Sequence, residues 1–289
     1  MNGILLVDKE QNWTSNDVVV KLKGILHQRR VGHAGTLDPM ATGLLVVFAG
    51  RATKAVSFAE QEEKRYRTAL HLGVVTDTQD IWGTVREEKP ADVSSAELER
   101  VLEHFTGEQM QLPPMYSAIH VNGKRLYDIA RRGGEVEREA RRICVRELKL
   151  LGQEGGDWIL DIRCSRGTYV RTLCHDIGAA LGCGGCMSAL RRTETGPFSV
   201  DHALTVSEIW MLSEEGKLGK FFLPTDSLFT GSPACRASSE EERRIRCGTS
   251  YETALPDGEY RVYSEAGEFL MLGRSEQGSM RTVKNFFEV

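Results

Sequence analysis

The sequence predicts an α+β protein, with one large mixed domain followed by a small all-β module. The chain has 289 residues and is 40% hydrophobic, which is enough for a sizeable core and for more than one domain. Strand and helix patterns both occur through the first 230 residues. After that point, short apolar runs alternate with Gly- and Pro-containing turns, which is typical of a small β module.

The overall charge gives no sign of a nucleic-acid partner, because the formal net charge is −4. An RNA site would have to be local, and residues 121–150 carry nine Lys or Arg against five Asp or Glu. No apolar run reaches the roughly 18 residues that a membrane span needs. The N-terminal stretch MNGILLVDKEQ does not resemble a signal peptide. We therefore expect a cytoplasmic protein, and its seven cysteines, an odd number, do not indicate a disulfide framework.

The elements follow from local patterns. Thr14 and Asp17 match a capping box, and apolar residues at helical spacing extend that helix to about residue 26. Residues 31–50 read as a Gly-rich loop and then a buried strand, LLVVF. Residues 113–142 hold two prolines, a Gly-Gly pair and many arginines, which predicts a protruding loop with a short helix. Further strands are expected at 3–8, 65–75, 143–151 and 158–164, helices at 95–105 and after the turn at 165–169, a polar turn at 77–84, and a domain boundary within 224–235.

Asp38 is the first candidate for chemistry. It lies among glycines in GTLDPMATG, and Pro39 biases it toward an extended or turn geometry. A carboxylate in such a turn before a buried strand is a common active-site placement, but an ordinary turn has the same pattern. Arg171 could pair with that carboxylate, and Tyr66 could stack on a base extruded from RNA. Spacing alone does not bring these three residues together.

Other motifs indicate neither cofactor nor metal. Cys183 and Cys186 form a single CxxC, whereas structural zinc sites usually pair two such elements. The sequence has no dinucleotide-binding GxGxxG after a strand, no P-loop, no HExxH and no GxSxG. We therefore expect chemistry that uses side chains alone, with no cofactor.

Seven blocks of the sequence, in order, resemble the bacterial TruB-type tRNA pseudouridine synthases and cover most of residues 1–226. The blocks are GILLVDKEQNWTSNDVV, RRVGHAGTLDPMATGLLVV, GRATK, KRYRTALHLGVVTDTQD, PPMYSAIHVNGKRLYDIAR, SRGTYVRTLCHDIG and LRRTETGPF. The resemblance implies conversion of uridine 55, in the T arm of transfer RNA, to pseudouridine. It also implies a catalytic domain (1–230) around a long antiparallel sheet flanked by helices, and a PUA-like RNA-binding barrel (231–289).

The resemblance also implies roles for single residues. Asp38 would be the catalytic aspartate, Arg171 its partner, and Tyr66 the tyrosine that packs on the target base. The region of about 113–142 would grip RNA. The remaining implied site residues are His33, which would help open the T loop, Leu190 on the apolar side of the pocket, Asp80 and Tyr169 as pocket support, and Lys54, Arg141 and Arg142 as RNA-binding residues.

The sequence departs from the family pattern at Glu10, where proline is usual, and at Asn12, where glycine is usual. Asn tolerates left-handed backbone geometry, so the turn can survive. Three other functions stay open: an RNA chaperone without chemistry, a nucleoside hydrolase, and a guide-RNA-dependent subunit. The lack of long basic extensions favours a stand-alone enzyme, and we expect a monomer that also assists tRNA folding and has no guide RNA or membrane partner.

Overall fold

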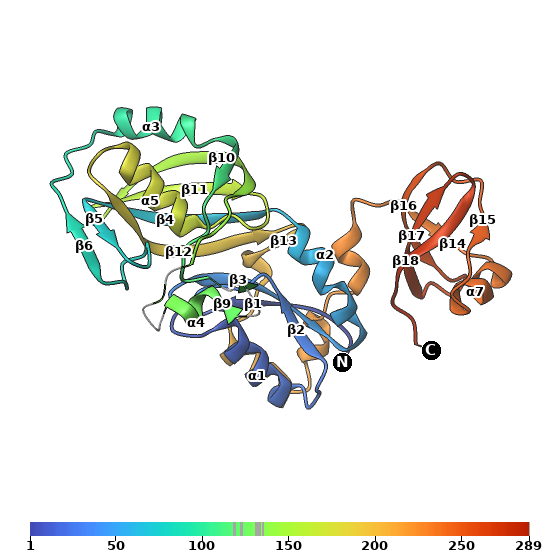
Figure 1. Cartoon of the computed structure of the whole chain (residues 1–289). Helices are drawn as coiled ribbons and strands as arrows, with labels where there is room; N and C mark the ends of the chain where they lie inside the picture. The colour runs from blue at the N-terminus through green and yellow to red at the C-terminus, as the bar shows by residue number, and fades with distance from the viewer. Residues whose placement is uncertain (118–119, 122–123, 131–133, 135, 289) are drawn as a thin grey trace.

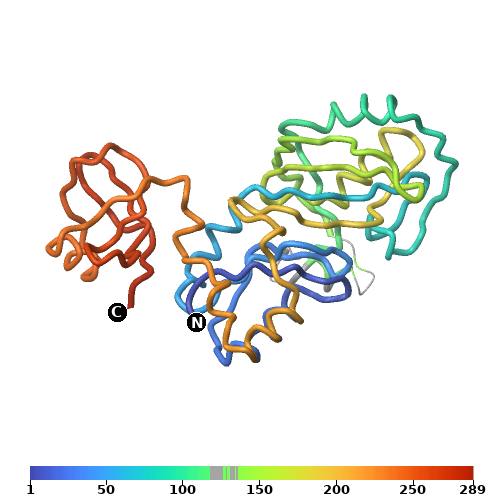
Figure 2. The backbone as a smooth tube through the Cα atoms, turned by 180° about the vertical axis from the view of Figure 1, so that it is seen from behind, coloured from blue at the N-terminus to red at the C-terminus, as the bar shows by residue number. Residues whose placement is uncertain are grey.

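The protein is described by a computed structural model that covers residues 1–117, 120–121, 124–130, 134 and 136–288 (Figure 1). A long sheet runs through the large part of the molecule, and a smaller five-stranded sheet forms the C-terminal module (Figures 1 and 2). The strands of the large part are β1 (Gly3–Lys9), β2 (Val31–Ala34), β3 (Thr42–Ala49), β4 (Lys64–Leu72), β5 (Val74–Thr76), β6 (Val85–Glu88), β7 (Gly107–Gln111), β8 (His120–Val121), β9 (Lys124–Arg125), β10 (Arg141–Glu154), β11 (Asp157–Cys164), β12 (Gly185–Thr195) and β13 (Phe198–Ser199). Its helices are α1 (Ser15–Ile25), η1 (Gly50–Ala55), α2 (Val56–Gln61), α3 (Ser95–His104), α4 (Leu126–Ala130), α5 (Val170–Ala180), η2 (Val200–His202), α6 (Val206–Glu214), η3 (Leu218–Phe221) and η4 (Thr225–Phe229).

The large sheet has nine strands in the order β1-β3-β12-β4-β11-β10-β7, with β2 beside β3 and β13 beside β12. The expected long antiparallel sheet is mixed instead, because β12 pairs with β3 in parallel through Arg191 and Arg192. This contact is short, since β2 pairs with the other half of β3. The two halves of the sheet therefore meet only where β3 begins, which is also where the Asp38 loop ends.

The N-terminal elements agree with the sequence prediction. Thr14 and Asp17 form the expected capping box at the start of α1. Asn12 has a φ of 69°, so it adopts the left-handed geometry that its side chain tolerates. Its backbone N–H donates to the Pro39 carbonyl at 2.9 Å, and the buried Lys9 ammonium donates to the Trp13 carbonyl. The turn after β1 thus supports the Asp38–Pro39 step.

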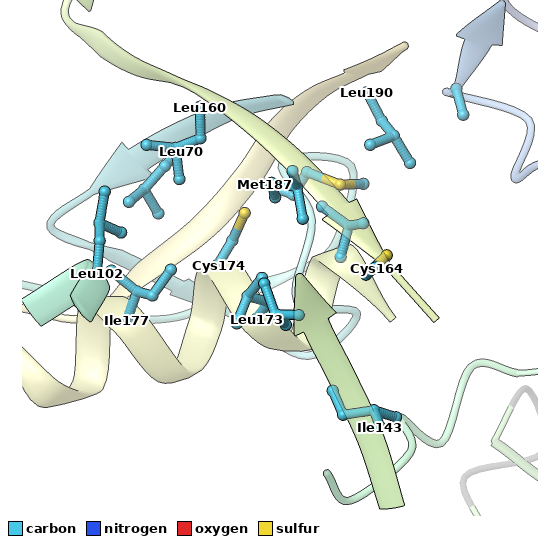
Figure 3. Close-up of a cluster of buried hydrophobic side chains, with 14 of the residues drawn as sticks. Leu70, Leu102, Ile143, Leu160, Cys164, Leu173, Cys174, Ile177, Met187 and Leu190 are labelled. Carbon is cyan, nitrogen blue, oxygen red and sulfur yellow. The ribbon is translucent and has the colours of Figure 1, made fainter. Parts of the chain in front are cut away.

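A buried apolar cluster fixes α5 against the strands. Leu173 and Ile177 are fully buried, and Leu181 packs against the same cluster. Figure 3 shows the α5 side chains pointing toward Leu70 of β4 and Met187 of β12. This packing holds the first turn of α5, which contains Arg171, at a fixed place beside the sheet.

The region of 113–142 contains the short helix that the sequence predicted, α4, and the small β8–β9 pair. Residues 118–119, 122–123, 131–133 and 135 of the expected RNA-gripping insertion lie outside the described residues. Arg141 and Arg142, at the predicted end of the insertion, are the first residues of β10 and pair there with β7. The strand predicted over 143–151 is β10, which extends from Arg141 to Glu154.

The C-terminal module is a sheet of β14 (Ala234–Arg236), β15 (Tyr251–Glu252), β16 (Gly258–Tyr263), β17 (Phe269–Glu276) and β18 (Ser279–Asn285). Its order is β14-β16-β17-β18-β15. The expectation of an all-β module is wrong, because α7 (Ser239–Arg246) packs there through buried Ile245. Ser238 and Glu241 form a capping box at its start, a signal that the sequence carries. None of the helices in the described part of the chain is long and apolar enough to cross a membrane.

Candidate active site

A cavity of about 260 Å³ opens where the two halves of the large sheet meet. Most of its wall comes from the loop of residues 35–38, from side chains of β4 and β12, and from the turn that leads into α5, and Glu60 and Ser117 complete it. Of the residues predicted from the sequence, Asp38, Tyr66, Tyr169, Arg171 and Leu190 lie in its wall. The structure thus brings together side chains that are more than 130 positions apart.

Arg171 and Asp38 form an ion pair, with 3.0 Å between Arg171 Nε and Asp38 Oδ2. The Arg171 side chain is only 6% exposed. Its Nη2 donates to the Tyr116 carbonyl at 2.9 Å, and its Nη1 donates to the Thr78 carbonyl at 3.3 Å. Because the guanidinium is planar and is held from several sides, its orientation toward Asp38 is fixed.

Asp80 forms a second ion pair with the same guanidinium, with 3.5 Å between Asp80 Oδ2 and Arg171 Nη1. Its Oδ1 accepts hydrogen bonds from the Thr78 hydroxyl at 2.9 Å and from the Trp82 N–H at 3.1 Å. Burial raises the pKa of Asp80, whereas these hydrogen bonds and the charge of Arg171 oppose the rise. Asp80 therefore supports the ion pair without lining the cavity.

The Asp38 carboxylate is partly open to solvent, since its side chain is 39% exposed in the free protein. The buried partner of the ion pair is Arg171. The loop itself is anchored, because the Leu37 N–H donates to Ser15 Oγ, the first residue of α1, at 2.9 Å.

Tyr66 and Leu190 give the cavity its apolar walls. Leu190 is buried on β12, and Tyr66 lies half-buried on the neighbouring strand β4. Burial raises the pKa of the Tyr66 phenol, against the opposing charge of Arg192. The phenol is therefore neutral at physiological pH.

Two family models match the chain. The TruB family pseudouridylate synthase (N terminal domain) model matches residues 23–170, and the tRNA pseudouridylate synthase B C-terminal domain model matches residues 171–230. The chain belongs to the TruB family of pseudouridine synthases. The tRNA pseudouridine synthase B of Syntrophomonas wolfei is 41% identical, with 98% of this chain and 96% of that protein covered. The protein of the same name from Clostridium kluyveri is 37% identical over 99% of this chain and 100% of that protein.

Solved structures agree with this membership. A Cbf5-Nop10-Gar1 complex contains a chain that is 26% identical with a TM-score of 0.76, covering 99% of this chain and 85% of that one. A structure of an H/ACA RNP bound to a substrate RNA matches with a TM-score of 0.75 at 24% identity, which shows the fold alone. The enzyme class implied by the sequence resemblance, a TruB-family tRNA pseudouridine synthase, is thus confirmed.

Tyr169 is the N-cap residue of α5 in this TruB-family chain. Its backbone N–H donates to the Gln111 side-chain carbonyl at 2.8 Å, and the Gln111 amide donates back to the Tyr169 carbonyl at 3.0 Å. This two-way contact ties the turn before Arg171 to β7. Burial raises the pKa of the Tyr169 phenol, which remains uncharged at neutral pH.

The other predicted residues lie outside the cavity wall. His33 is half-buried on β2, and burial together with the charge of Arg192 lowers its pKa, so its imidazole is neutral near pH 7. Lys54 donates to Asn285 Oδ1 at 2.7 Å, next to the C-terminal module. Arg142 pairs with Glu108, and both side chains are exposed.

Sequence reasoning missed two buried cations in the cavity wall. Arg192 is only 1% exposed and donates to the Leu44 carbonyl at 2.7 Å and to the Gly35 carbonyl at 2.9 Å, so it ties both ends of the Asp38 loop to β12. Burial lowers the pKa of Lys64 to about 8. Strand periodicity could have found Arg192, because it lies two residues after Leu190 and so shares its face.

The cysteines of the CxxC motif form no metal site in the described part of the chain. No group of three or more His, Cys, Asp or Glu residues there is placed to hold a metal ion. Cys183 and Cys186 are buried as free thiols, and burial raises the pKa of Cys186 to about 11. They pack as small apolar residues, Cys183 in the turn before β12 and Cys186 at the start of that strand.

Proposed function

We propose that this protein isomerises the uridine conventionally numbered 55, in the T arm of transfer RNA, to pseudouridine, with Asp38 as the catalytic residue. The observation that carries the proposal is the Asp38–Arg171 ion pair at 3.0 Å in a cavity walled by Tyr66 and Leu190. The relatives named tRNA pseudouridine synthase B support the substrate class. The position within the RNA rests on the resemblance of the sequence blocks.

The size of the cavity suits a single nucleotide. Its volume of about 260 Å³ lies just below the range of about 300–1,000 Å³ for drug-sized ligands. A base inside a folded loop has to leave its stack, which costs a few kcal/mol. Stacking on the Tyr66 ring would return about 1–3 kcal/mol, and Leu190 would cover the opposite side.

The reaction breaks the bond from N1 of uracil to C1′ of the ribose and forms a bond from C5 to C1′, while the hydrogen leaves C5 and N1 gains one. No atom is gained or lost, so the chemistry requires neither an oxidant nor an energy donor. The Asp38 carboxylate would start it in one of two ways, by attacking C1′ or by abstracting a proton from the sugar. Arg171 keeps the carboxylate oriented, and the bound RNA would cover its exposed side.

The remaining residues act around this centre in the proposal. His33, neutral on β2, occupies space that the loop bases vacate, while Asp80 and Tyr169 hold Arg171 in place. Lys54, Arg141, Arg142 and the insertion of about 113–142 contact RNA phosphates. The chain has two domains in this proposal: residues 1–230 carry out catalysis, and residues 231–289, a PUA-like module, bind RNA. The protein works in the cytoplasm as a monomer without guide RNA or cofactor and assists tRNA folding.

Incubation of the purified protein with an unmodified T-arm stem-loop tests this proposal. Pseudouridine at the target position, mapped by chemical adduct and primer extension, is the expected result. The mass of the RNA should stay unchanged and no free uracil should form, in contrast to the products of a nucleoside hydrolase. Binding without any isomer would instead identify an RNA chaperone.

Tyr66 should contribute mainly through its ring. Tyr66→Ala is expected to lower turnover by about 5- to 150-fold, because it removes a stacking contact of about 1–3 kcal/mol. Tyr66→Phe keeps the ring and should lose less than tenfold. Initial rates at several RNA concentrations measure both variants, and thermal unfolding controls for folding. Equal losses in the two variants would show that the hydroxyl, rather than the ring, matters.

The two arginines at the start of β10 should differ in their effect on the salt dependence of RNA binding. Arg142 is paired with Glu108, whereas Arg141 has no carboxylate partner in the described part of the chain. Arg141→Gln is expected to flatten the log–log salt slope by about 0.7–0.9, and Arg142→Gln by less. Glu108→Gln should steepen the slope, because it frees Arg142 for a phosphate. Identical slopes for all three variants would mean that this end of β10 faces away from RNA.

A further inference from the structure

A second cavity lies at the outer edge of β1 and is separate from the candidate active site. Its volume is about 710 Å³, within the range of about 300–1,000 Å³ for small-molecule sites. It shares no lining residue with the cavity around Asp38. Apart from Leu6 of β1, every lining residue belongs to residues 197–230. In both overall views the orange segment after β13 runs beside the blue N-terminal strands (Figures 1 and 2).

The β1 edge leaves one backbone donor over at this cavity. Ile4 donates to the Leu223 carbonyl at 2.8 Å and accepts from the Leu223 N–H at 2.8 Å. Farther along, Asp8 donates to the Leu204 carbonyl at 2.9 Å, and the Leu6 carbonyl accepts from the Leu204 N–H at 3.0 Å. Alternate residues of a strand direct their backbone groups to the same edge, so the Leu6 N–H points between Leu204 and Leu223. No acceptor for it lies among the described residues, although Leu6 is only 4% exposed.

The width of this gap restricts what can occupy it. A buried donor without a partner is unfavourable, so an occupant that offers a carbonyl oxygen to the Leu6 N–H is stabilised there. Extended peptides pair with strand edges through such bonds. Because Leu223 and Leu204 already accept from the donors on either side, a strand that continued past Leu6 would displace one of them. The gap therefore admits the end of a peptide chain rather than its middle.

The floor of the cavity suits apolar side chains. Leu6, Phe198 and Leu223 line it and belong to the buried cluster beneath β1, so the floor is continuous with the core. Phe221 also lines the cavity, and 42% of its surface is exposed. Burying an exposed aromatic ring against an apolar side chain is favourable.

The charges at the rim select a carboxylate. Lys220 lines the cavity, is exposed, and forms no ion pair with a carboxylate of the described residues, whereas Lys217 pairs with Glu215 at 2.8 Å. Asp201 also lines the cavity, but its carboxylate accepts a hydrogen bond from Ser199 Oγ at 2.8 Å. A free ammonium attracts the carboxylate end of a peptide chain and repels the ammonium end.

We propose that this cavity binds the C-terminal end of a partner chain whose last residues are apolar. A carbonyl oxygen near that end accepts a hydrogen bond from the Leu6 N–H, an apolar side chain packs over Phe198, and the terminal carboxylate pairs with Lys220. The inference goes beyond the proposed function, because it assigns a protein partner to the molecule and uses no residue of the Asp38 cavity.

Two fluorescein-labelled peptides test the proposal: Gly-Ser-Gly-Leu-Leu with a free C-terminal carboxylate, and the same peptide with a C-terminal amide. Fluorescence anisotropy should show saturable binding of the free acid with a Kd below about 1 mM. The amide should bind about two- to fivefold more weakly, which is the size of an exposed ion pair. Lys220→Gln should weaken binding of the free acid by the same factor and leave the amide unchanged. The matched control, Lys217→Gln at the start of η3, should bind both peptides as the unmodified protein does.

Two further measurements locate the peptide. In NMR spectra the free acid should shift the backbone amide signal of Leu6, whereas Leu5, which pairs with Val47 of β3, should shift little. Ala203→Phe places a ring in the cavity and should abolish saturable binding, with thermal unfolding as the control for folding. No saturable binding of the free acid, or a Leu6 signal that stays in place on the bound protein, would overturn the inference. Equal binding of acid and amide would also overturn it and would identify a site for neutral apolar molecules.

Discussion

Asp38→Asn is expected to lower pseudouridine formation by at least about 10⁴-fold while changing the dissociation constant of the RNA by no more than a few-fold. Asparagine has the shape of aspartate and can still accept a hydrogen bond from Arg171 Nε, which lies 3.0 Å from Asp38 Oδ2. It has neither the charge to attack C1′ nor the basicity to take a sugar proton. Single-turnover rates and filter binding with the same stem-loop measure the two quantities.

Two controls make this result specific. Thermal unfolding should show a small change for Asp38→Asn, because Arg171 keeps Asp80 and two backbone carbonyls as partners. Asp38→Glu keeps the charge but moves the carboxylate by one methylene, and a displacement of about 1 Å can cost about 100-fold in rate. Turnover above about 1% of the unmodified protein in Asp38→Asn would refute the catalytic role.

The parts of the fold that follow local rules were predictable. The Thr14–Asp17 capping box placed α1, and the left-handed turn at Asn12 was expected from its side chain. The helix α7 was also signalled, by Ser238 and Glu241, but a turn-rich background of short apolar runs concealed it. Capping boxes depend on residues three positions apart, which is why a single sequence reveals them.

Contacts between segments that are far apart in the sequence could not be predicted from the spacing of residues along the chain. Nothing local places Asp38 beside Arg171, because their contact depends on β12 joining β3 in parallel and on α5 packing under the sheet. Before the structure, only the resemblance to a family predicted that these residues lie together. The sequence also does not reveal that Arg171 and Arg192 are buried while the Asp38 side chain stays partly exposed. Which partner of an ion pair is buried depends on the shape of the cavity, and shape is a property of the whole fold.

Arg171→Gln is expected to destabilise the protein by about 3–5 kcal/mol at pH 8 and to lower turnover by about 100-fold or more. The stability loss arises because Asp80, whose side chain is 10% exposed, would keep its charge without the guanidinium 3.5 Å away. Turnover falls because, without Arg171, the Asp38 carboxylate is held less often in the orientation that the reaction needs. Urea unfolding and single-turnover rates measure the two effects.

The pH dependence of that stability loss identifies its cause. The pKa of Asp80 is already raised by burial, and removing Arg171 raises it further, because the positive charge that favours the carboxylate is gone. A raised pKa in the folded state means that the folded protein binds a proton more readily than the unfolded chain, so stability increases as pH falls toward the unfolded pKa near 4. The deficit of Arg171→Gln should therefore shrink between pH 8 and pH 5. When Asp80→Asn is added, and the deficit is measured against Asp80→Asn alone, the part of this pH dependence that comes from Asp80 should disappear. A deficit equally large at both pH values in the single variant would assign the loss to packing alone and would remove Asp80 from the proposed support of the catalytic pair.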